Sequence, residues 1–322
     1  MERNIDLQRY LLNNRIILVI SGPTASGKTK ISLELTNDLN IEIISADSRQ
    51  IFKYINIGTA KPTIEELSIV PHHFIDCLEL DEYYSAGMFE KDAEEIISEI
   101  FNRGRIPVIT GGTGLYIKAL CEGIFDDDKN EENSNIRNDL QEILEKEGKE
   151  VLYDKLVEID PVAAQKYDDK NPRRVMRALE YYYSKGKKLS DAHIQSIKEK
   201  EFKIIYFGVQ KPREILYDLI NERVLNMWEA GLENETKNIL EMGYPETLNS
   251  LQTVGYKETL SYIKGNITKE EAIYLIQRNT RRYAKRQMTW FRSLENIIWI
   301  ENREDIIKYL KQIVSRETLK DE

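Results

Sequence analysis

The sequence contains few of the residues that build covalent or metal cross-links. Its 322 residues include two cysteines, Cys77 and Cys121, and three histidines. The cysteines form no Cys-x-x-Cys pair and the histidines have no partners at metal-ligand spacing, so neither a disulfide framework nor a zinc site is indicated. The fold must therefore depend on a packed core, for which a chain with 41% hydrophobic residues is long enough.

Long apolar runs and an excess of positive charge are also absent. No run approaches the roughly 18 residues that a membrane span needs, and the N-terminal segment MERNIDLQRYLLNN is too charged for a signal peptide. We therefore expect a cytoplasmic protein with no membrane association. The net charge of −9 argues against indiscriminate nucleic-acid binding, although a local basic patch stays compatible with it.

Short apolar runs alternate with segments of helical period. The runs are residues 16–20, 41–46, 106–110, 202–209 and 297–300. This alternation predicts an α/β fold in which a parallel sheet is flanked by helices and ligands bind at the carboxyl ends of the strands. Residues 124–200 are charged and helical in period, so we predict a helical insertion there, between core segments 1–123 and 201–322.

The segment GPTASGKT follows the first apolar run and has the spacing of a phosphate-binding loop, which makes the core P-loop NTPase-like. Backbone N–H groups converge on an anion in such a loop, Lys28 adds a charge, and the Thr29 hydroxyl can ligate Mg²⁺. A nucleotide triphosphate, commonly ATP, is the usual ligand. The alternative is a glycine turn with a helix-capping Thr. The predicted loop comprises Gly22, Pro23, Thr24, Ala25, Ser26, Gly27, Lys28 and Thr29.

Two further segments should end at the same edge of the sheet. Asp47 follows the run 41–46 and is either a reactive carboxylate or the residue that closes an Asx-turn. Thr113 lies in GGTGLY, after the run 106–110, and is expected to point into the same crevice. Such glycine-rich segments are more often plain turns when they are considered alone.

Basic residues gather in two helical segments although the chain is acidic. Between residues 278 and 292 there are six basic residues and no acid, and positions 278, 281, 282 and 285 share one helix face. Arg173, Arg174 and Arg177 open a second helix in KNPRRVMRALE. A solvated face explains either segment alone, whereas a basic stripe in an acidic protein indicates a local polyanion site.

In chain order, these segments resemble the motif series of the bacterial tRNA dimethylallyltransferases, the tRNA isopentenyltransferase family. The motifs are GPTASGKT, DSRQIF, TAKP, PHHFID, GGTGLYIKAL, DPVAAQKYDDKNPRRVMRALE, VGYKE and AKRQMTWFR, and they run from about residue 16 to residue 293. Members transfer the dimethylallyl group of dimethylallyl diphosphate to the exocyclic N6 amine of the adenosine 3′-adjacent to the anticodon. The reaction uses Mg²⁺, gives N6-dimethylallyladenosine (isopentenyladenosine) and releases diphosphate.

The resemblance implies a role for individual residues. Asp47 corresponds to the catalytic aspartate, and Thr113 and Arg223 correspond to further catalytic positions. Arg223 matches an arginine that reaches the diphosphate, although a helix-surface arginine is equally compatible with its sequence position. The phosphate loop then holds an allylic diphosphate, with Mg²⁺ on Thr29. The implied tRNA contacts are Asp47, Ser48, Arg49, Gln50, Thr113, Arg137, Arg173, Arg174, Val175, Met176, Arg177, Gly255, Tyr256, Lys257, Lys285, Arg286, Gln287, Met288, Thr289, Trp290, Phe291 and Arg292.

Three other functions agree with parts of this pattern. A transferase of the same fold that acts on free adenine nucleotides would not need the basic helices. A small-molecule kinase would bind ATP in the loop, but only Asp47 offers a clear Mg²⁺-binding aspartate after a strand. A non-catalytic RNA-binding, ATPase-like module would leave Asp47 dispensable. We expect a monomeric cytoplasmic transferase that acts on the anticodon stem-loop of tRNA.

Overall fold

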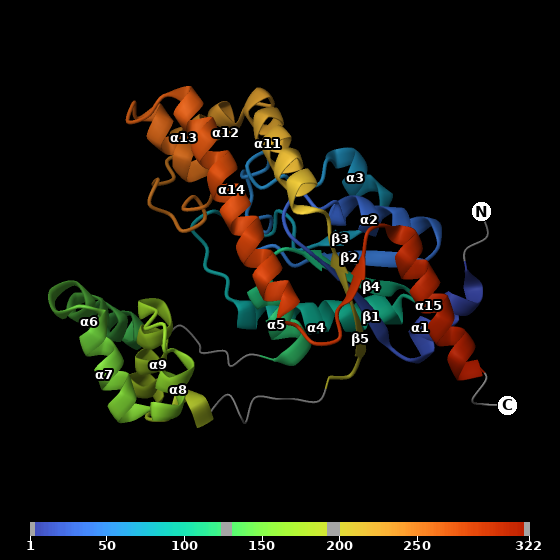
Figure 1. Cartoon of the computed structure of the whole chain (residues 1–322), viewed down its shortest axis with the longest axis horizontal. Coiled ribbons are helices and arrows are strands. Elements are labelled where there is room, and N and C mark those ends of the chain that lie inside the picture. Colours follow the sequence, from blue (N-terminus) through green and yellow to red (C-terminus); the bar gives the residue numbers. More distant parts are fainter. Residues whose placement is uncertain (1–3, 124–130, 192–199, 319–322) are drawn as a thin grey trace. The chain divides into compact units, whose positions relative to one another are not determined.

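The structure, a computed structural model, describes residues 4–123, 131–191 and 200–318 (Figure 1). It contains one six-stranded sheet, and its strands all pair in parallel in the order β3-β2-β4-β1-β5-β6. The strands are β1 (Ile16–Ser21), β2 (Ile41–Ser45), β3 (His72–His73), β4 (Ile106–Gly111), β5 (Lys203–Val209) and β6 (Ile298–Ile300). The predicted α/β fold with a parallel sheet is therefore confirmed. Strand β3 was not predicted, because it does not lie in an apolar run.

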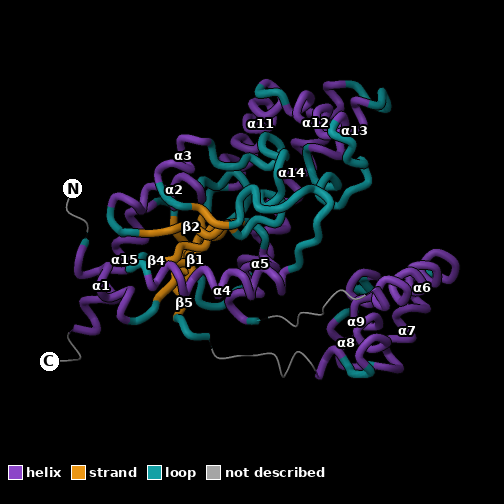
Figure 2. Tube along the Cα trace, turned by 180° about the vertical axis from the view of Figure 1, so that it is seen from behind, coloured by secondary structure: helices purple, strands orange, loops and turns teal. Residues whose placement is uncertain are grey.

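The strands form the centre of a layered core, with helices around them (Figure 2). All six residues of β1 and all five of β2 are buried. Leu18 of β1 belongs to one cluster with Leu11 of helix α1 (Ile5–Asn13) and Leu310 of helix α15 (Arg303–Thr318). Parallel strands covered on both faces need apolar side chains on both, which is why the strands read as continuous Ile, Leu and Val runs.

The connections around β1 determine where a ligand can bind. β1 pairs with β4 on one side and with β5 on the other, so the direction of winding reverses at this strand. In open parallel sheets, ligands bind beyond the carboxyl ends of the strands at such a point. The phosphate loop (residues 22–29) follows β1, Asp47 follows β2, and Gly112 follows β4, so the three predicted segments lie at one edge of the sheet.

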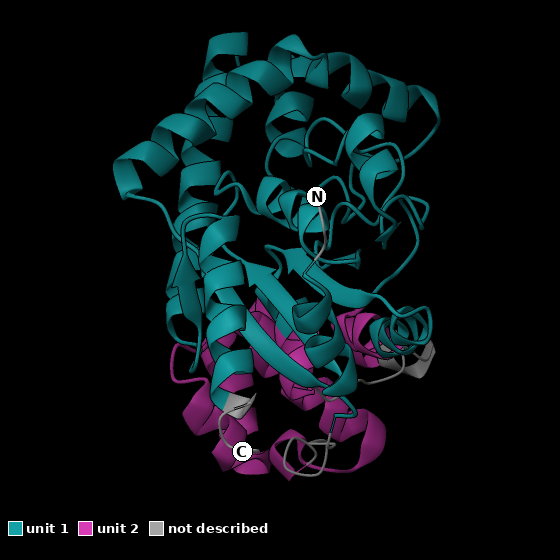
Figure 3. Ribbon diagram, turned by 90° about the vertical axis from the view of Figure 1, so that its right-hand side faces the viewer, with its two compact units in different colours: residues 1–84, 92–117, 200–322 teal, residues 85–91, 118–199 magenta. Residues whose placement is uncertain are grey.

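Most helices belong to the same compact unit as the sheet. This unit comprises residues 1–84, 92–117 and 200–322, and residues 85–91 and 118–199 form a second unit (Figure 3). The predicted ends of the helical insertion, near residues 124 and 200, border segments 124–130 and 192–199, which lie outside the described residues. Helix α4 (Ala86–Asn102) and helix α5 (Gly114–Glu122) each contribute residues to both units.

A group of helices within the larger unit stands beyond the sheet and has its own apolar core (Figure 1). It consists of α11 (Arg213–Glu229), α12 (Leu232–Glu241), α13 (Tyr256–Ile263) and α14 (Lys269–Arg292). Trp228, Ile239 and Ile276 belong to this core, and Ile51 and Ile55 from the segment after β2 join it. The segment that carries Asp47 is therefore anchored on the helical group as well as on the sheet.

The remaining helices are shorter or belong to the second unit. Helix α2 (Lys28–Glu34) ends where a 3-10 turn, η1 (Leu35–Asn37), begins, and α3 (Ile64–Ile69) follows β2. The second unit contains α6 (Glu131–Glu147), α7 (Lys149–Ile159), α8 (Pro161–Lys166) and α9 (Pro172–Lys185). Their apolar cluster includes Leu140, Leu152 and Leu179, so this unit has a core of its own.

Candidate functional site

A cleft of about 660 Å³ opens at the carboxyl edge of the sheet. The phosphate loop, the segment after β2 and the helices α11 and α14 all contribute to its walls. The residues of the predicted site that line it are Thr24, Ala25, Gly27, Lys28, Thr29, Asp47, Ser48, Arg49, Gln50, Arg223, Gly255 and Gln287. The structure therefore brings together the three groups whose charge defines the predicted chemistry, Lys28, Asp47 and Arg223.

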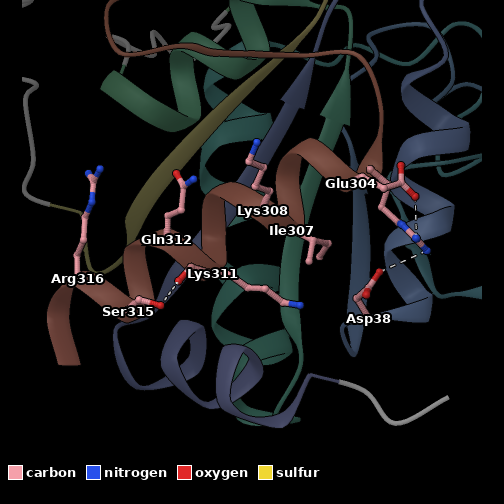
Figure 4. A pocket seen from close by; sticks show the side chains of 9 residues that line it. Asp38, Glu304, Ile307, Lys308, Lys311, Gln312, Ser315 and Arg316 are labelled. Atoms are coloured by element: carbon pink, nitrogen blue, oxygen red, sulfur yellow. Dashed lines mark hydrogen bonds and ion pairs between the residues drawn. The ribbon is translucent and has the colours of Figure 1, made fainter. Parts of the chain in front are cut away.

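A second hollow, of about 630 Å³, runs along α15 and contains none of the predicted site residues (Figure 4). Lys308, Lys311 and Arg316 are among the residues that line it, together with Asp38. Arg303 is paired with Asp38 at 3.4 Å at one end of this hollow. The hollow has no clustered reactive groups comparable to those of the cleft, so the cleft is the candidate site.

The phosphate loop is sharply bent between β1 and α2. Ala25 and Gly27 have positive φ values of 62° and 94°. At Gly22 a Cβ atom would lie 2.8 Å from the carbonyl oxygen of Val209 in β5, so the close approach of that strand requires a glycine. Gly27 is the N-cap of α2, whose first backbone N–H groups have no partner within the helix. The loop is therefore shaped to offer backbone donors to an anion.

Lys28 is held in the cleft close to two other charged groups. Its Nζ donates a hydrogen bond of 2.8 Å to the carbonyl oxygen of Pro23. Burial and, to a smaller extent, the charge of Arg223 lower the pKa of Lys28 to about 7, and Asp47 acts in the opposite direction. The free energy cost of charging this lysine would fall if an anion bound beside it.

Arg223 lies on α11 and lines the cleft. Burial lowers the pKa of its guanidinium, and the neighbouring Asp47 partly offsets this effect. Of the two roles that the sequence left open, the placement favours a ligand-facing arginine over a helix-surface one. The cleft is lined by more basic than acidic side chains, so it is suited to an anion of more than one negative charge. The basic ones are Lys28, Lys30, Arg49, Lys61 and Arg223, and the acidic ones are Asp47 and Glu66.

Asp47 closes a turn and also lines the cleft. Its Oδ1 accepts hydrogen bonds from the backbone N–H groups of Arg49 at 2.9 Å and Gln50 at 3.4 Å. The Asx-turn considered from the sequence is therefore present. Within the described residues no hydrogen bond reaches Oδ2, so this oxygen stays available to a ligand while the other one fixes the side chain.

Thr113 supports the segment next to Asp47 and is not among the residues that line the cleft. Its Oγ1 accepts a hydrogen bond of 3.0 Å from the backbone N–H of Ser48 and lies 3.3 Å from the Ser48 hydroxyl oxygen. Its own backbone N–H donates to the carbonyl oxygen of Ala46 at 3.1 Å. The contacts of Thr113 are thus those of a residue that positions the Asp47 segment.

The basic residues of α14 divide between two environments. Arg281 donates to the side chain of Asn221 on α11, and the Arg278 guanidinium lies 5.9 Å from the ring centroid of Tyr274. Four of the six basic residues between positions 278 and 292 are exposed, namely Arg282, Lys285, Arg286 and Arg292. The exposed basic surface is therefore shorter than the stripe expected from the sequence, because Arg281 is engaged by the neighbouring helix.

The arginines of the second unit lie on exposed parts of its helices. Arg173 and Arg174 are exposed in the first turn of α9, and Arg177 is half-buried. The Nε of Arg137 on α6 lies 3.5 Å from a carboxylate oxygen of Glu180, and the rest of its side chain is largely exposed. These positions leave cationic groups accessible to a polyanion.

Several side chains that the resemblance assigned to RNA contact are buried. They are Val175, Met176, Tyr256, Gln287 and Phe291. Val175 and Met176 pack in the core of the second unit, and Tyr256 packs in that of the helical group. Gln287 lines the cleft, whereas the other four side chains support exposed neighbours such as Arg174 and Lys257.

Glu235 of α12 was not predicted as a functional residue. Its carboxylate accepts hydrogen bonds from the backbone N–H groups of Asn56, Ile57 and Gly58, at distances from 2.9 to 3.3 Å, and from the Tyr256 hydroxyl. The 56–58 segment leads to Thr59 and Ala60, which line the cleft. Glu235 thus holds one wall of the cleft, and a lone Glu in a helical pattern carries no signal of this contact.

The cleft contains oxygen donors of the kind that hard divalent cations bind. No cluster of three or more His, Cys, Asp or Glu side chains suited to a metal occurs among the described residues. Mg²⁺ typically binds one or two protein oxygens together with substrate phosphates. The Thr29 hydroxyl and the Asp47 carboxylate line the same cleft and supply donors of this kind.

In the part of the chain that the structure describes, no helix is long and apolar enough to cross a membrane. The chain matches the family model for IPP transferase over residues 50–294. It is 41% identical over 300 residues to the tRNA dimethylallyltransferase 1 of Syntrophotalea carbinolica, a match that covers 93% of this chain and 95% of the relative.

Two solved structures are also similar to this chain. The full-length tRNA isopentenylpyrophosphate transferase from Bacillus halodurans is 39% identical with a TM-score of 0.66, and the match covers 95% of this chain and 96% of that one. A eukaryotic dimethylallyltransferase acting on tRNA is 31% identical with a TM-score of 0.73, over 86% of this chain and 70% of that one.

Proposed function

This chain belongs to the IPP transferase family, that of the tRNA dimethylallyltransferases, and we propose that its cleft transfers the dimethylallyl group of dimethylallyl diphosphate to tRNA. The chain is a prenyltransferase with a P-loop NTPase-like core that modifies a tRNA adenosine. The proposed acceptor is the N6 amine of the adenosine 3′-adjacent to the anticodon. The products are N6-dimethylallyladenosine and diphosphate.

The observation that carries this proposal is the placement of Lys28, Arg223 and Asp47 in one cleft beside the phosphate loop. As the allylic C–O bond breaks, its electron pair stays with the diphosphate oxygen and positive charge develops on the allylic carbon. Loop N–H groups, Lys28 and Arg223 stabilise the charge that builds on the leaving group. Such preorganised donors act most strongly in a site from which water is largely excluded.

Thr29 and the diphosphate oxygens would hold Mg²⁺, which when bound supplies additional positive charge to the leaving group. The acceptor needs a different kind of help. The lone pair of an adenine amine is delocalised into the ring, so the amine becomes a useful nucleophile only when a base takes its proton during attack. Asp47 Oδ2 is the proposed base, while Oδ1 keeps the carboxylate oriented.

In this mechanism the C–N bond forms from the N6 lone pair as the C–O bond breaks, and one N6 proton passes to Asp47. The adenine must leave its stack to enter the cleft, which is a general requirement for chemistry on a base. Thr113 contributes indirectly, because it holds Ser48 beside Asp47.

The RNA is held by exposed basic groups outside the cleft. Arg282, Lys285, Arg286 and Arg292 on α14 form one such group, and Arg173 and Arg174 on α9 form another. Phosphate contacts of this type orient a nucleic acid without reading its sequence. We further propose that the enzyme acts as a monomer and in the cytoplasm, together with its tRNA substrate.

Incubation with dimethylallyl diphosphate or ATP, with and without tRNA, followed by mass analysis of nucleosides and nucleotides, tests the proposal. The expected result is a dimethylallyl adduct of one tRNA adenosine that forms without ATP. Modification of free AMP or ADP, or ATP consumption with a phosphorylated small molecule, would each replace the proposed acceptor or reaction. RNA binding without any transfer would identify a binding module.

The Lys28→Ala variant separates the leaving-group site from the RNA site. We expect it to bind dimethylallyl diphosphate more weakly, or to break the allylic C–O bond more slowly. Its affinity for tRNA should stay near that of the wild type. Full transfer activity combined with a loss of tRNA affinity would show that the loop does not hold the leaving group.

A further inference from the structure

Gln287 joins helix α14 to two of the loops that build the cleft. Its side chain is only 6% exposed. Its Oε1 accepts a hydrogen bond of 2.9 Å from the backbone N–H of Thr24 in the phosphate loop. Its Nε2 donates a hydrogen bond of 2.8 Å to the carbonyl oxygen of Gly112, in the loop after β4. One amide therefore ties the loops after β1 and β4 to the same helix.

The fit around Gln287 leaves no space for a larger neighbour. A Cβ atom on Gly112 would lie 2.3 Å from Nε2 of Gln287, so the glycine permits the approach of the amide. One turn further along α14, the indole of Trp290 lies 2.7 Å from where a Cβ atom on Gly114 would be. Two glycines of GGTG thus accept two side chains of α14, which fixes the helix against this loop.

The contact with Thr24 is significant for the shape of the phosphate loop. Other hydrogen bonds described for residues 23–27 stay close in sequence, such as that from the Ser26 N–H to the Pro23 carbonyl at 3.2 Å. Within the described hydrogen bonds, the bond between Thr24 and Gln287 joins this loop to an element 263 residues away. The loop contains three residues with positive φ, and one of them, Ala25, is not a glycine, so the loop benefits from an external constraint.

The side chain of Gln287 is suited to this task by its chemistry. It must accept from an N–H on one side and donate to a carbonyl on the other. A Glu side chain would keep the acceptor but turn a second acceptor toward Gly112, and a Met side chain of similar length would offer neither bond. The neighbouring residue Arg286 is exposed, so Gln287 faces the loops whereas Arg286 faces the solvent.

We propose that Gln287 is a positioning residue for the site that binds dimethylallyl diphosphate. It holds the phosphate loop in the shape that binds the diphosphate, and it does not contact the RNA. This inference rests on the proposed function and revises the RNA-contact role that the family resemblance implied for this position. The two faces of α14 then have different roles: the buried face supports the site of dimethylallyl diphosphate, and the exposed basic face binds the RNA.

The test compares Gln287→Met and Gln287→Glu with two control variants. Gln277→Met removes another half-buried amide of α14, which donates to the Asn221 carbonyl at 3.2 Å instead of to the phosphate loop. Arg286→Ala changes the adjacent exposed residue. For each protein, calorimetry gives the dissociation constants of inorganic diphosphate and dimethylallyl diphosphate, fluorescence anisotropy gives that of an anticodon stem-loop RNA, and kinetics gives both KM values.

Both Gln287 variants should bind diphosphate roughly tenfold to a hundredfold more weakly and raise the KM for dimethylallyl diphosphate similarly, as seen when groups that orient a ligand-binding residue are removed. Their RNA dissociation constants should stay within about twofold of the wild type, given that no exposed cation is removed. Arg286→Ala should give the reverse pattern. Gln277→Met should leave diphosphate binding unchanged.

Thermal unfolding shows whether each variant folds, and Gln287→Glu replaces Gln287→Met if the latter does not. Diphosphate affinity equal to that of the wild type in the Gln287 variants would overturn the inference, as would an equal loss of RNA and diphosphate affinity. A wild-type protein that binds no diphosphate would instead contradict the proposed function, and the inference with it.

Discussion

The Oδ1 oxygen of Asp47 accepts a hydrogen bond of 2.9 Å from the backbone N–H of Arg49, and this bond closes the turn on which the floor of the cleft is built. The same carboxylate raises the pKa values of Lys28 and Arg223 against the effect of burial. A single side chain therefore shapes the backbone and sets the charge balance of the site. The two roles can be separated, because only one of them needs a negative charge.

The Asp47→Asn variant makes this separation. Asn keeps the size of the side chain and an oxygen that can accept from the Arg49 N–H, so the turn and the fold should be preserved. Loss of the base should lower the rate of transfer by roughly 10² to 10⁴. Single-turnover transfer, substrate binding and thermal unfolding are measured on the same preparation. Near-normal turnover would eliminate Asp47 as the base.

Lys28 should make the stability of the free protein depend on pH. Burial and Arg223 lower its pKa to about 7, while in the unfolded chain the lysine keeps its ordinary value of 10.5. Between these two values the unfolded state binds more protons than the folded state, so the contribution of Lys28 to stability rises as the pH increases from about 7 to about 10. The wild type should gain stability over Lys28→Met across this range.

Urea unfolding of both proteins at several pH values measures this difference and cancels the titration of other groups. Saturating dimethylallyl diphosphate should reduce the pH trend, since a bound anion favours the charged lysine. A stability difference that is constant with pH in the absence of the diphosphate would contradict the effect of burial on Lys28.

The exposed basic residues of α14 should make RNA binding depend on salt. If Arg282 contacts an RNA phosphate, Arg282→Gln should reduce the slope of log affinity against log salt concentration by about one unit. Lys308→Gln on α15 is the matched control, because it removes an equally exposed charge from the second hollow (Figure 4). Equal slopes for the wild type and Arg282→Gln would remove Arg282 from the contact surface.

Glu235 should stabilise the fold through its hydrogen bonds with the backbone of residues 56–58. In Glu235→Gln an amide nitrogen replaces an oxygen that accepts backbone N–H groups of residues 56–58, so at least one of these exposed or part-buried donors loses its partner. We expect a loss of about 1–3 kcal/mol in the free energy of unfolding. Denaturant unfolding measures it directly.

Glu233→Gln, in the same helix, is the control for the Glu235 substitution. Glu233 pairs with Lys237 one turn further along α12, where solvent screens the charges. This substitution should have a much smaller effect, since ion pairs of this kind contribute little. Similar losses for the two variants would show that the contact with the 56–58 segment does not stabilise the fold.

Much of the fold can be predicted from short segments of the sequence. The apolar runs at 16–20, 41–46 and 106–110 became the central strands β1, β2 and β4, because strands buried on both faces are mostly apolar on both. The strand β3 could not be predicted, because its two histidines have no apolar pattern. They form a strand by pairing with Ile43 and Ile44 of β2. A segment so short and polar becomes a strand only where a sheet edge is available.

The sequence also determined the phosphate loop and the position of Asp47, because glycine spacing and a polar residue directly after a strand are properties of short segments. Only the tertiary structure decided that Arg223 enters the cleft, that Arg281 is engaged by α11, and that Gln287 bonds the phosphate loop. These contacts join residues far apart in the chain, such as Thr24 and Gln287, which are 263 positions apart. Periodicity identifies which residues share a helix face, but what that face meets depends on how the helices pack on the sheet.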